Sequence, residues 1–305
     1  MKKTLIAILA LAAVACNKAE VVSVAEGEAI QFGNAFVDNA TKADYSSTDI
    51  ASFNVYGTVN DVNIYKATQV TKTDDYTKAW TCGVTQYWIE SAAYKFAALV
   101  DVPEENVTTD KNGMPVSFTY TADGTTDILY DYAVATGQAK GSNEIVAFTF
   151  KHLLAKAYFT VTNQTDDTKY TYTVSNVKVT NTYPNGTYTV YTTDDGTGTW
   201  GSYGDPSSTT FATINDVAFG KPRTNAELLL IPGASVGVSF TVTLFIDGNE
   251  VTSFDHAVAN VVTLAQNSVY NFDVKLSPND PIQFTVTAKP TWNTPVSNNT
   301  VTVSK

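Results

Sequence analysis

Residues 238–248 read VSFTVTLFIDG, and this stretch shows the pattern of a β-strand more clearly than any other part of the chain. Its apolar side chains occupy every second position: Val238, Phe240, Val242, Leu244 and Ile246. On a strand, such residues lie on one face of the sheet. Asp247-Gly248 follows and favours the tight turn of a hairpin. The stretch therefore predicts a half-buried strand that ends in a hairpin.

Segments with the same alternation recur along the chain, at residues 53–59, 170–174, 270–276 and 282–288. The 17 Tyr and 15 Phe residues also favour strands. Residues 91–100 have some helical propensity but alternate as well, and we expect a strand there. Three further dipeptides predict hairpin turns: Asn112-Gly113, Asp123-Gly124 and Asn185-Gly186. Short strands separated by such turns predict an all-β fold of two tandem antiparallel β-sandwiches.

The apolar face changes sides between residues 147 and 161. Phe148 and Phe150 share one parity, whereas Ala155 and Phe159 share the other. A flat strand cannot switch faces without a bulge or bend, so we expect a break near Leu153. A chain of 305 residues is long enough for two domains. We therefore predict one domain at residues 43–152 and a second at 153–305, with His152 as a structural residue at their junction.

The net charge of −11 argues against a nucleic-acid partner, because binding a phosphate backbone needs a basic surface. The acidic balance is a poor match to an anionic membrane and suits solubility outside the cell. The chain has two cysteines, Cys16 and Cys82. If Cys16 is committed to lipid, Cys82 has no partner for a disulfide and is expected to be a small buried apolar residue.

The N-terminus has the features of a secretion signal. Met1-Lys2-Lys3 is basic, and residues 5–15 form an apolar run too short to span a bilayer. Small residues lead directly to Cys16, as in the lipobox of bacterial lipoproteins. We predict a signal peptide at residues 1–15 and a lipidated propeptide at 16–42 that begins with Cys16.

The propeptide contains a short strand pattern in which Ile30, Phe32 and Phe36 lie at period two. Lys42 follows in a small, polar loop and is the only basic residue between Lys18 and Lys66. A protease that cuts after basic residues would separate this strand from the rest of the chain at Lys42-Ala43. The loss of the strand would leave unpaired strand edges, which are a template for another strand.

The C-terminus offers a candidate replacement strand, the donor segment 282–305. It has two apolar alternations, Ile282, Phe284, Val286 and Ala288, and then Val301 and Val303. Burial of the first four contributes on the order of 5–8 kcal/mol. A tail of one copy that fits a slot of the next makes a head-to-tail contact, which builds fibres. The sequence leaves open which half of the segment donates.

Two motifs match catalytic or cofactor patterns but lack the required context. Residues 196–201 match G-x-G-x-x-G, but they lie in a turn-rich region with no helix expected after them. Residues 233–237 match G-x-S-x-G, but a strand follows instead of a helix. His152 and His256 lie in separate strands, and no metal-ligand spacing is present. We expect no enzyme activity, no cofactor and no metal.

Several segments together resemble the fimbrillin family of Bacteroidales surface pili, the type V pili. They are the lipobox at Cys16, the site Ala40-Thr41-Lys42-Ala43, Tyr87-Trp88 with 94–97, 148–156, 229–232, 270–272, 282–284 and 291–293. The resemblance covers nearly the whole chain. It implies a lipoprotein with two transthyretin-like β-sandwiches, held at the outer membrane until a trypsin-like surface protease cuts after the first strand. Lys42 matches the cut position, where many members carry arginine.

The resemblance further implies export to the cell surface, a place in the fimbrium, and other copies or related pilins as partners. A host or bacterial surface receptor is a further partner that it implies. We favour a structural stalk subunit, because the alternating segment after Pro281 fits a donor. Two alternatives remain: a tip or accessory adhesin of the same fold, and a monomeric surface lipoprotein that binds glycans.

Overall fold

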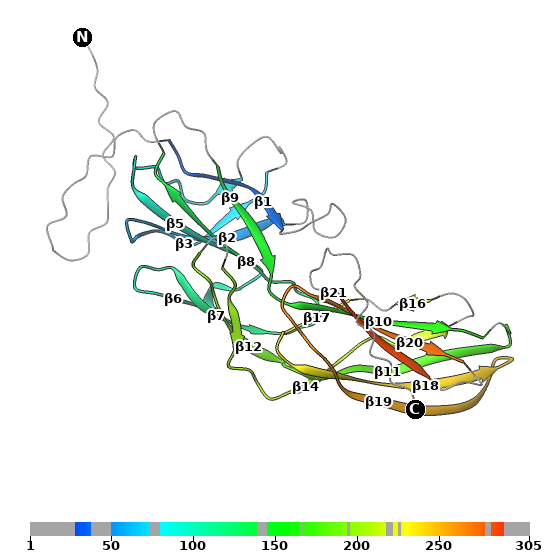
Figure 1. Cartoon of the computed structure of the whole chain (residues 1–305). Coiled ribbons are helices and arrows are strands. Elements are labelled where there is room, and N and C mark those ends of the chain that lie inside the picture. Colours follow the sequence, from blue (N-terminus) through cyan, green and yellow to red (C-terminus); the bar gives the residue numbers. More distant parts are fainter. Residues whose placement is uncertain are drawn as a thin grey trace, which may run out of the picture.

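The structure is a computed structural model of the 305-residue chain. It describes residues 28–37, 50–73, 80–138, 145–165, 167–193, 196–217, 222–224, 227–277 and 282–289. Within these ranges every regular element is a strand, except for the short 3₁₀ helix η1 (Glu104–Asn106). The predicted all-β sandwich fold is confirmed (Figure 1). The predicted sites Cys16, Lys42, Ala43, Val301 and Val303 lie outside the described residues.

The first sheet has seven strands in the order β1-β9-β8-β5-β2-β3-β4. In that order they are Gln31–Val37, Ile145–His152, Leu129–Thr136, Ala93–Val100, Ser52–Val59, Val62–Thr71 and Thr81–Cys82. β5 confirms the strand expected at residues 91–100. Phe32 of β1 forms an isolated bridge with Trp80, next to β4. The two edges of the sheet therefore approach each other around a core that contains Phe32, Phe96 and Phe148.

The second sheet joins strands from the two halves of the chain, in the order β13-β12-β7-β6. These strands are Thr199–Gly201, Asn185–Thr189, Pro115–Thr121 and Val107–Thr109. β12 pairs with β7 from Asn185–Thr121 to Thr189–Ser117. A shared core lies against this sheet and includes Phe118 and Tyr188 together with Leu153, Leu229 and Val269. The domain boundary at residues 152 and 153 stays a prediction, and contacts cross it.

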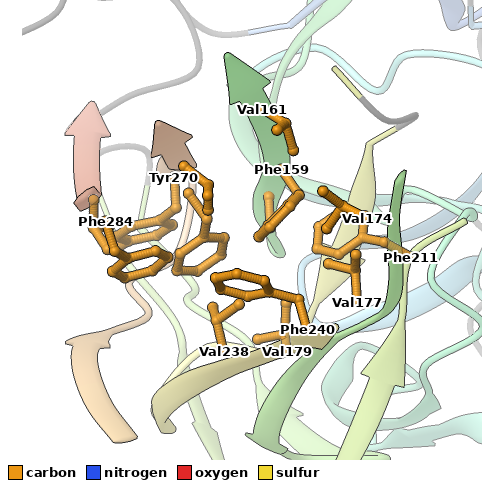
Figure 2. Close-up of a cluster of buried hydrophobic side chains, with 14 of the residues drawn as sticks. Phe159, Val161, Val174, Val177, Val179, Phe211, Val238, Phe240, Tyr270 and Phe284 are labelled. Atoms are coloured by element: carbon orange, nitrogen blue, oxygen red, sulfur yellow. The ribbon is translucent and has the colours of Figure 1, made fainter. Parts of the chain in front are cut away.

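The C-terminal sandwich consists of two sheets. One has the order β16-β10-β20-β21, with β17 also paired to β10: Arg223–Thr224, Ala155–Asn163, Val269–Leu276, Gln283–Lys289 and Leu228–Leu230. The other has the order β14-β11-β18-β19, with β15 also paired to β11: Ser207–Thr210, Tyr170–Thr182, Ser235–Ile246, Asn249–Thr263 and Ile214–Val217. Figure 2 shows their apolar side chains meeting, with Phe159, Phe240 and Phe284 among them.

Two strand pairs depart from the antiparallel prediction. β1 runs parallel to β9, and β10 runs parallel to β20. Parallel partners cannot be joined by a tight turn, and both pairs here are formed by strands more than 100 residues apart in sequence. Alternation and turn dipeptides report only on local geometry, so they could not reveal these pairings.

The turn predictions had mixed outcomes. Asp247 and Gly248 join the paired strands β18 and β19 with φ values of 49° and 78°, so that hairpin is confirmed. The Asn112-Gly113 hairpin is also confirmed, between β6 and β7. The predicted hairpin at Asn185-Gly186 is wrong, because these residues begin β12, which pairs with the distant β7. Asp123-Gly124 makes a turn between strands of different sheets, so it is not a hairpin.

The predicted break near Leu153 is confirmed. β9 ends at His152, and β10 begins at Ala155. His152 is buried, and its Nδ1 lies 2.6 Å from Oδ2 of Asp127, just before β8. The histidine thus has a structural contact at the point where the chain leaves the first sheet for the C-terminal sandwich.

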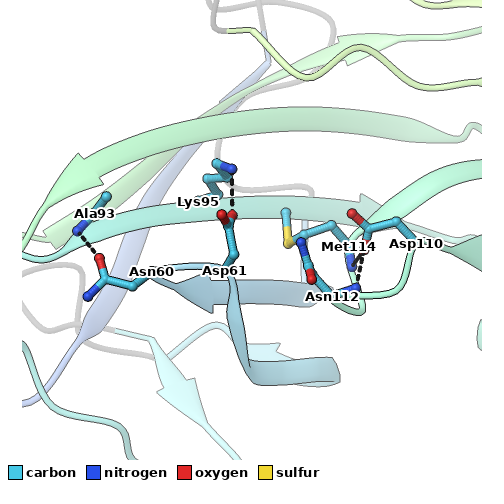
Figure 3. A network of polar contacts seen from close by, with 7 residues as sticks. All are labelled: Asn60, Asp61, Ala93, Lys95, Asp110, Asn112 and Met114. Carbon is cyan, nitrogen blue, oxygen red and sulfur yellow. Dashed lines mark hydrogen bonds and ion pairs between the residues drawn. The ribbon is translucent and has the colours of Figure 1, made fainter.

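Polar contacts connect the β2–β3 turn to neighbouring elements (Figure 3). Oδ1 of Asn60 accepts the Ala93 amide at 3.0 Å, and Lys95 Nζ lies 2.7 Å from Asp61 Oδ1. In the β6–β7 loop, the Asp110 carboxylate accepts the amides of Asn112 and Met114 at 2.9 and 2.8 Å. The exposed ion pair contributes little to stability, so backbone capping is the main role of these contacts.

Tyr188→Ala is expected to destabilise the whole molecule, because its ring fills the shared core. The ring is fully buried between Phe118 and Trp200, at centroid distances of 5.4 and 5.3 Å. We expect the free energy of unfolding to fall by about 3–5 kcal/mol in urea titrations, with fluorescence and circular dichroism moving together. Val251→Ala, at an exposed position of β19, is the control. A change confined to one of two separate transitions would contradict a shared core.

Candidate functional site

β1 is the first strand of the described chain, and its side chains alternate between water and core. Gln31 is exposed, whereas Ile30 and Phe32 are 4% and 0% exposed. The ladder with β9 has an irregularity: Gly33 pairs with Ala147, but Phe36 pairs with Thr149. The burial expected for Ile30 and Phe32 is seen. The side chain of Phe36 lies outside the described part, so its predicted burial stays a prediction.

β1 and the residues just before it are hydrogen-bonded along both edges. On one side it forms the parallel ladder with β9. On the other side the Trp80 amide donates to the carbonyl of Phe32 at 2.8 Å, and the Ile30 amide donates to Gln86 at 2.8 Å. The Trp88 amide donates to Glu28 at 2.9 Å. We call the space that β1 fills between β9 and residues 80–88 the β1 slot.

The floor of the β1 slot is aromatic. The Phe32 ring meets Tyr65 and Phe96 edge-on, at centroid distances of 5.3 and 5.7 Å, and stacks on Phe148 at 6.2 Å. Gly57 makes room for two of these rings, because a Cβ there would lie 2.9 Å from both Phe96 and Tyr65. Such aromatic contacts add to the free energy of area burial. Phe32 is therefore the main apolar anchor of β1.

The described side chains that form the floor of the slot are uncharged. Burial raises the pKa of the Tyr65 phenol well above its usual value, and burial also raises the pKa of Tyr94. Both stay neutral at physiological pH. The Tyr94 hydroxyl accepts the Ile89 amide at 2.7 Å and donates to the Tyr87 carbonyl at 3.3 Å. Tyr94 thereby fixes the segment that forms one wall of the slot, and an apolar strand is the occupant that such a site accepts.

The first half of the predicted donor segment lies in its own C-terminal sandwich. β21 pairs antiparallel with β20 at the edge of its sheet. Phe284 and Val286 are 2% and 3% exposed, and Phe284 stacks against Phe240 at 6.5 Å (Figure 2). Ile282 and Ala288 are partly buried against the same core. The structure thus places this half in the C-terminal sandwich of its own chain and not in the β1 slot.

The candidate catalytic motifs have no catalytic geometry. Residues 199–201 of the G-x-G-x-x-G match form β13, and Ser235 of the G-x-S-x-G match begins β18. His152 and His256 lie in β9 and β19, strands of different sheets. Among the described residues, no three His, Cys, Asp or Glu side chains are grouped as metal ligands would be. Cys82 is half-buried in β4, and burial raises the pKa of its thiol.

Sequence reasoning did not identify the second wall of the slot. Nothing in the spacing of Trp80 and Trp88 showed that residues 80–88 hydrogen-bond to β1. Asp127, the partner of His152, gave no signal either, because a lone acidic residue before a strand is usually part of a turn. None of the helices in the described ranges has the length and apolar character needed to cross a membrane.

Comparison with known proteins places this architecture in a family. The family model described as fimbrillin-like matches residues 34–292, most of the chain. The chain belongs to the fimbrillin-like family. This membership makes it a pilus-related subunit of a structural pilus and adhesion family, located at the cell surface and assembled with other pilin subunits.

Solved structures show the same fold for the fimbrillin-like chain. A candidate cell adhesion protein from Bacteroides uniformis is 19% identical, with a TM-score of 0.53 over 86% of this chain and 97% of that one. A second, from Bacteroides ovatus, is 15% identical, with a TM-score of 0.52 over 89% and 98%. A fimbrial assembly protein from Parabacteroides distasonis is 14% identical, with a TM-score of 0.51 over 90% and 100%. No curated protein matches the sequence significantly.

Phe32→Ala is expected to loosen β1 in the fimbrillin-like chain, because it removes the ring that fills the slot. We expect the free energy of unfolding to fall by about 3–5 kcal/mol in urea titrations. The matched control is Gln31→Ala on the exposed face of the same strand, which should stay within about 0.5 kcal/mol of the parent. Equal stability of the two variants would show that the aromatic floor does not hold β1.

Proposed function

We propose that this chain is a structural subunit, in the stalk of a cell-surface pilus, and that subunits assemble by protease-triggered strand exchange. In this proposal β1 is cut away, and the C-terminal segment of a second copy fills the slot. The observation that carries it is the position of β1, the first described strand, which pairs with β9 on one edge and, through Phe32 and the residues just before the strand, bonds residues 80–88 on the other. Its loss would expose an aromatic slot with unpaired backbone on both sides.

The cost of an empty slot drives the exchange. Burial of Ile30 and Phe32 contributes roughly 1.5–3 kcal/mol each, and every ladder hydrogen bond about 0.5–1.5 kcal/mol. A slot that has lost β1 can recover these contributions only from another apolar strand. The incoming segment must be ordered on binding, which offsets part of the gain. A segment with period-two apolar residues matches the requirement.

The cut is proposed at Lys42-Ala43 and the lipid at Cys16. β1 continues into the body of the chain through residues 38–49, so one cut in this stretch separates the strand without breaking any other connection. A trypsin-like protease fits Lys42, the only basic residue between Lys18 and Lys66. Until the cut, a lipid on Cys16 would hold the subunit at the outer membrane. The same cut releases the anchor and leaves β1 free to dissociate from the slot.

The donor is proposed within residues 282–305. If residues 282–288 donate, β21 must first leave β20 and withdraw Phe284 and Val286 from the core of its own sandwich. β21 lies at a sheet edge, so only one ladder has to break. If Val301 and Val303 donate instead, β21 can remain in place. The second route leaves the described fold intact.

The alternative of a tip or accessory adhesin has an observation in its favour. Phe284 and Val286 already complete the sandwich of their own chain. A subunit whose β21 stays paired with its own β20 can receive a strand without donating one, as a subunit at the end of a pilus would. This alternative keeps the β1 slot and the cut, and it differs only in the fate of the C-terminal segment.

The test uses the full chain without its signal peptide. Treatment with a trypsin-like protease should cut after Lys42 and yield ladders on unboiled denaturing gels, because exchanged strands hold neighbouring copies together. Lys42→Ala should abolish both the cut and the ladders. Lys18→Ala, upstream in the same propeptide, is the matched control and should leave both unchanged.

A second variant separates the two halves of the donor segment. Deletion of residues 290–305 spares every described residue, so its thermal melting should match that of the parent. Loss of ladders in this variant, with the cut unchanged, supports donation by Val301 and Val303. Ladders that persist assign donation to residues 282–288. Clean cutting of the parent chain with monomers only would contradict the stalk proposal and favour the tip.

A further inference from the structure

The strand β9, which forms one wall of the β1 slot, is poorly attached on its other side. Its ladder with β8 has two residue pairs, Leu129–His152 and Tyr130–Lys151. Its ladder with β1 has five pairs, from Ile145 to Phe150. The first six residues of β9 therefore depend on β1 for their backbone pairing. Any event that removes β1 also removes the main ladder that holds this wall.

A buried carboxylate lies between β8 and β9 at the point where their ladder stops. We call the line of contact between these two strands the seam. Asp131 follows Tyr130 on β8, and only 7% of it is exposed. Its Oδ2 accepts the Thr149 amide of β9 at 2.7 Å, in the place of a backbone carbonyl. Its Oδ1 lies 3.3 Å from the hydroxyl of Tyr191, which shares its proton with the Tyr130 carbonyl at 3.2 Å. A side chain thus replaces ladder bonds between these two strands.

The surroundings of Asp131 contain few charges. Tyr130 and Tyr132 flank it on β8, Lys151 lies on β9, and Tyr191 follows β12. Lys151 is engaged elsewhere: its Nζ donates to the Gly196 carbonyl at 3.0 Å and lies 4.9 Å from the Tyr191 ring centroid. The buried pair of Asp127 and His152 lies at the closed end of the seam. No cation in this set contacts the Asp131 carboxylate directly.

We propose that Asp131 is the positioning residue that holds β9 as a wall of the β1 slot, and that its ionisation sets how readily this wall opens. The inference deepens the proposed strand exchange, since it concerns the slot that exchange would use. With Asp131 protonated, the seam is neutral and closed. With Asp131 ionised, the closed seam keeps a negative charge away from water at a cost in free energy. That cost falls when β9 moves away and water reaches the carboxylate.

Burial raises the pKa of Asp131 to about 6, although hydrogen bonds from Thr149, Tyr132 and Tyr191 and the charge of Lys151 oppose the rise. When the seam opens, the group returns toward the ordinary carboxyl value. The closed state is thus favoured at low pH, and this advantage is lost as the pH rises toward and through 6. From pH 5 to pH 7.5, opening should become more frequent by about tenfold.

Hydrogen exchange of the uncut full chain tests this inference, with protection corrected for intrinsic exchange rates. Protection of the Thr149 amide, which donates to Asp131, should fall about tenfold between pH 5 and pH 7.5. Asp131→Asn keeps an acceptor for the Thr149 amide but cannot ionise, so its profile should be flat. Asp273→Asn is the matched control: burial also raises the pKa of Asp273, but that residue lies in β20 of the C-terminal sandwich. This control should keep the parent profile.

A second variant covers the case in which Asp131→Asn does not fold. Tyr191→Phe removes a hydrogen bond that lowers the pKa of Asp131, so the fall in protection should move to higher pH. A parent-like profile in Asp131→Asn, or in Tyr191→Phe where the first variant does not fold, would overturn the inference. Because the measurement needs neither cut nor assembly, failure of strand exchange and failure of the Asp131 inference are distinguishable.

Discussion

The insertion of one phenylalanine ring into an aromatic floor is the contact on which the N-terminal part of this molecule depends. Phe32 touches Tyr65, Phe96 and Phe148, which come from three different strands. The ring also lies where the two edges of the seven-stranded sheet approach each other. Phe32 therefore fills the core and also lies where the two edges of the sheet meet.

Because of this arrangement, the loss of β1 would also affect the neighbouring strand β9. β9 is paired along most of its length with β1 and only briefly with β8, so the wall and the occupant of the slot are not independent. The Asp131 carboxylate stands where ladder bonds would otherwise continue. A complete β8–β9 ladder would make the wall rigid whether or not β1 is present. A side-chain contact makes its rigidity conditional on proton concentration and on the occupant.

The sequence allowed the strands to be predicted more reliably than their partners. Alternation located β5 and β18, and Asp247-Gly248 located a true hairpin, because these signals describe neighbouring residues. The hairpin predicted at Asn185-Gly186 was wrong, because the strand that begins there pairs with β7, which lies more than 60 residues earlier. The burial of Ile30 and Phe32 was predictable from period two. The wall at residues 80–88 and the Asp131 contact were not, because both arise from tertiary pairing that leaves no periodic trace.

The sheet that joins β12 to β7 has a mechanical consequence. Its core contains side chains from both halves of the chain, such as Phe118 and Val269, and the Trp200 indole donates to the Leu153 carbonyl at 2.8 Å. Tension that enters at one end of the molecule is therefore shared among many packed side chains and does not fall on one connecting segment. The two halves cannot be pulled apart without exposing this core to water, so they resist tension together.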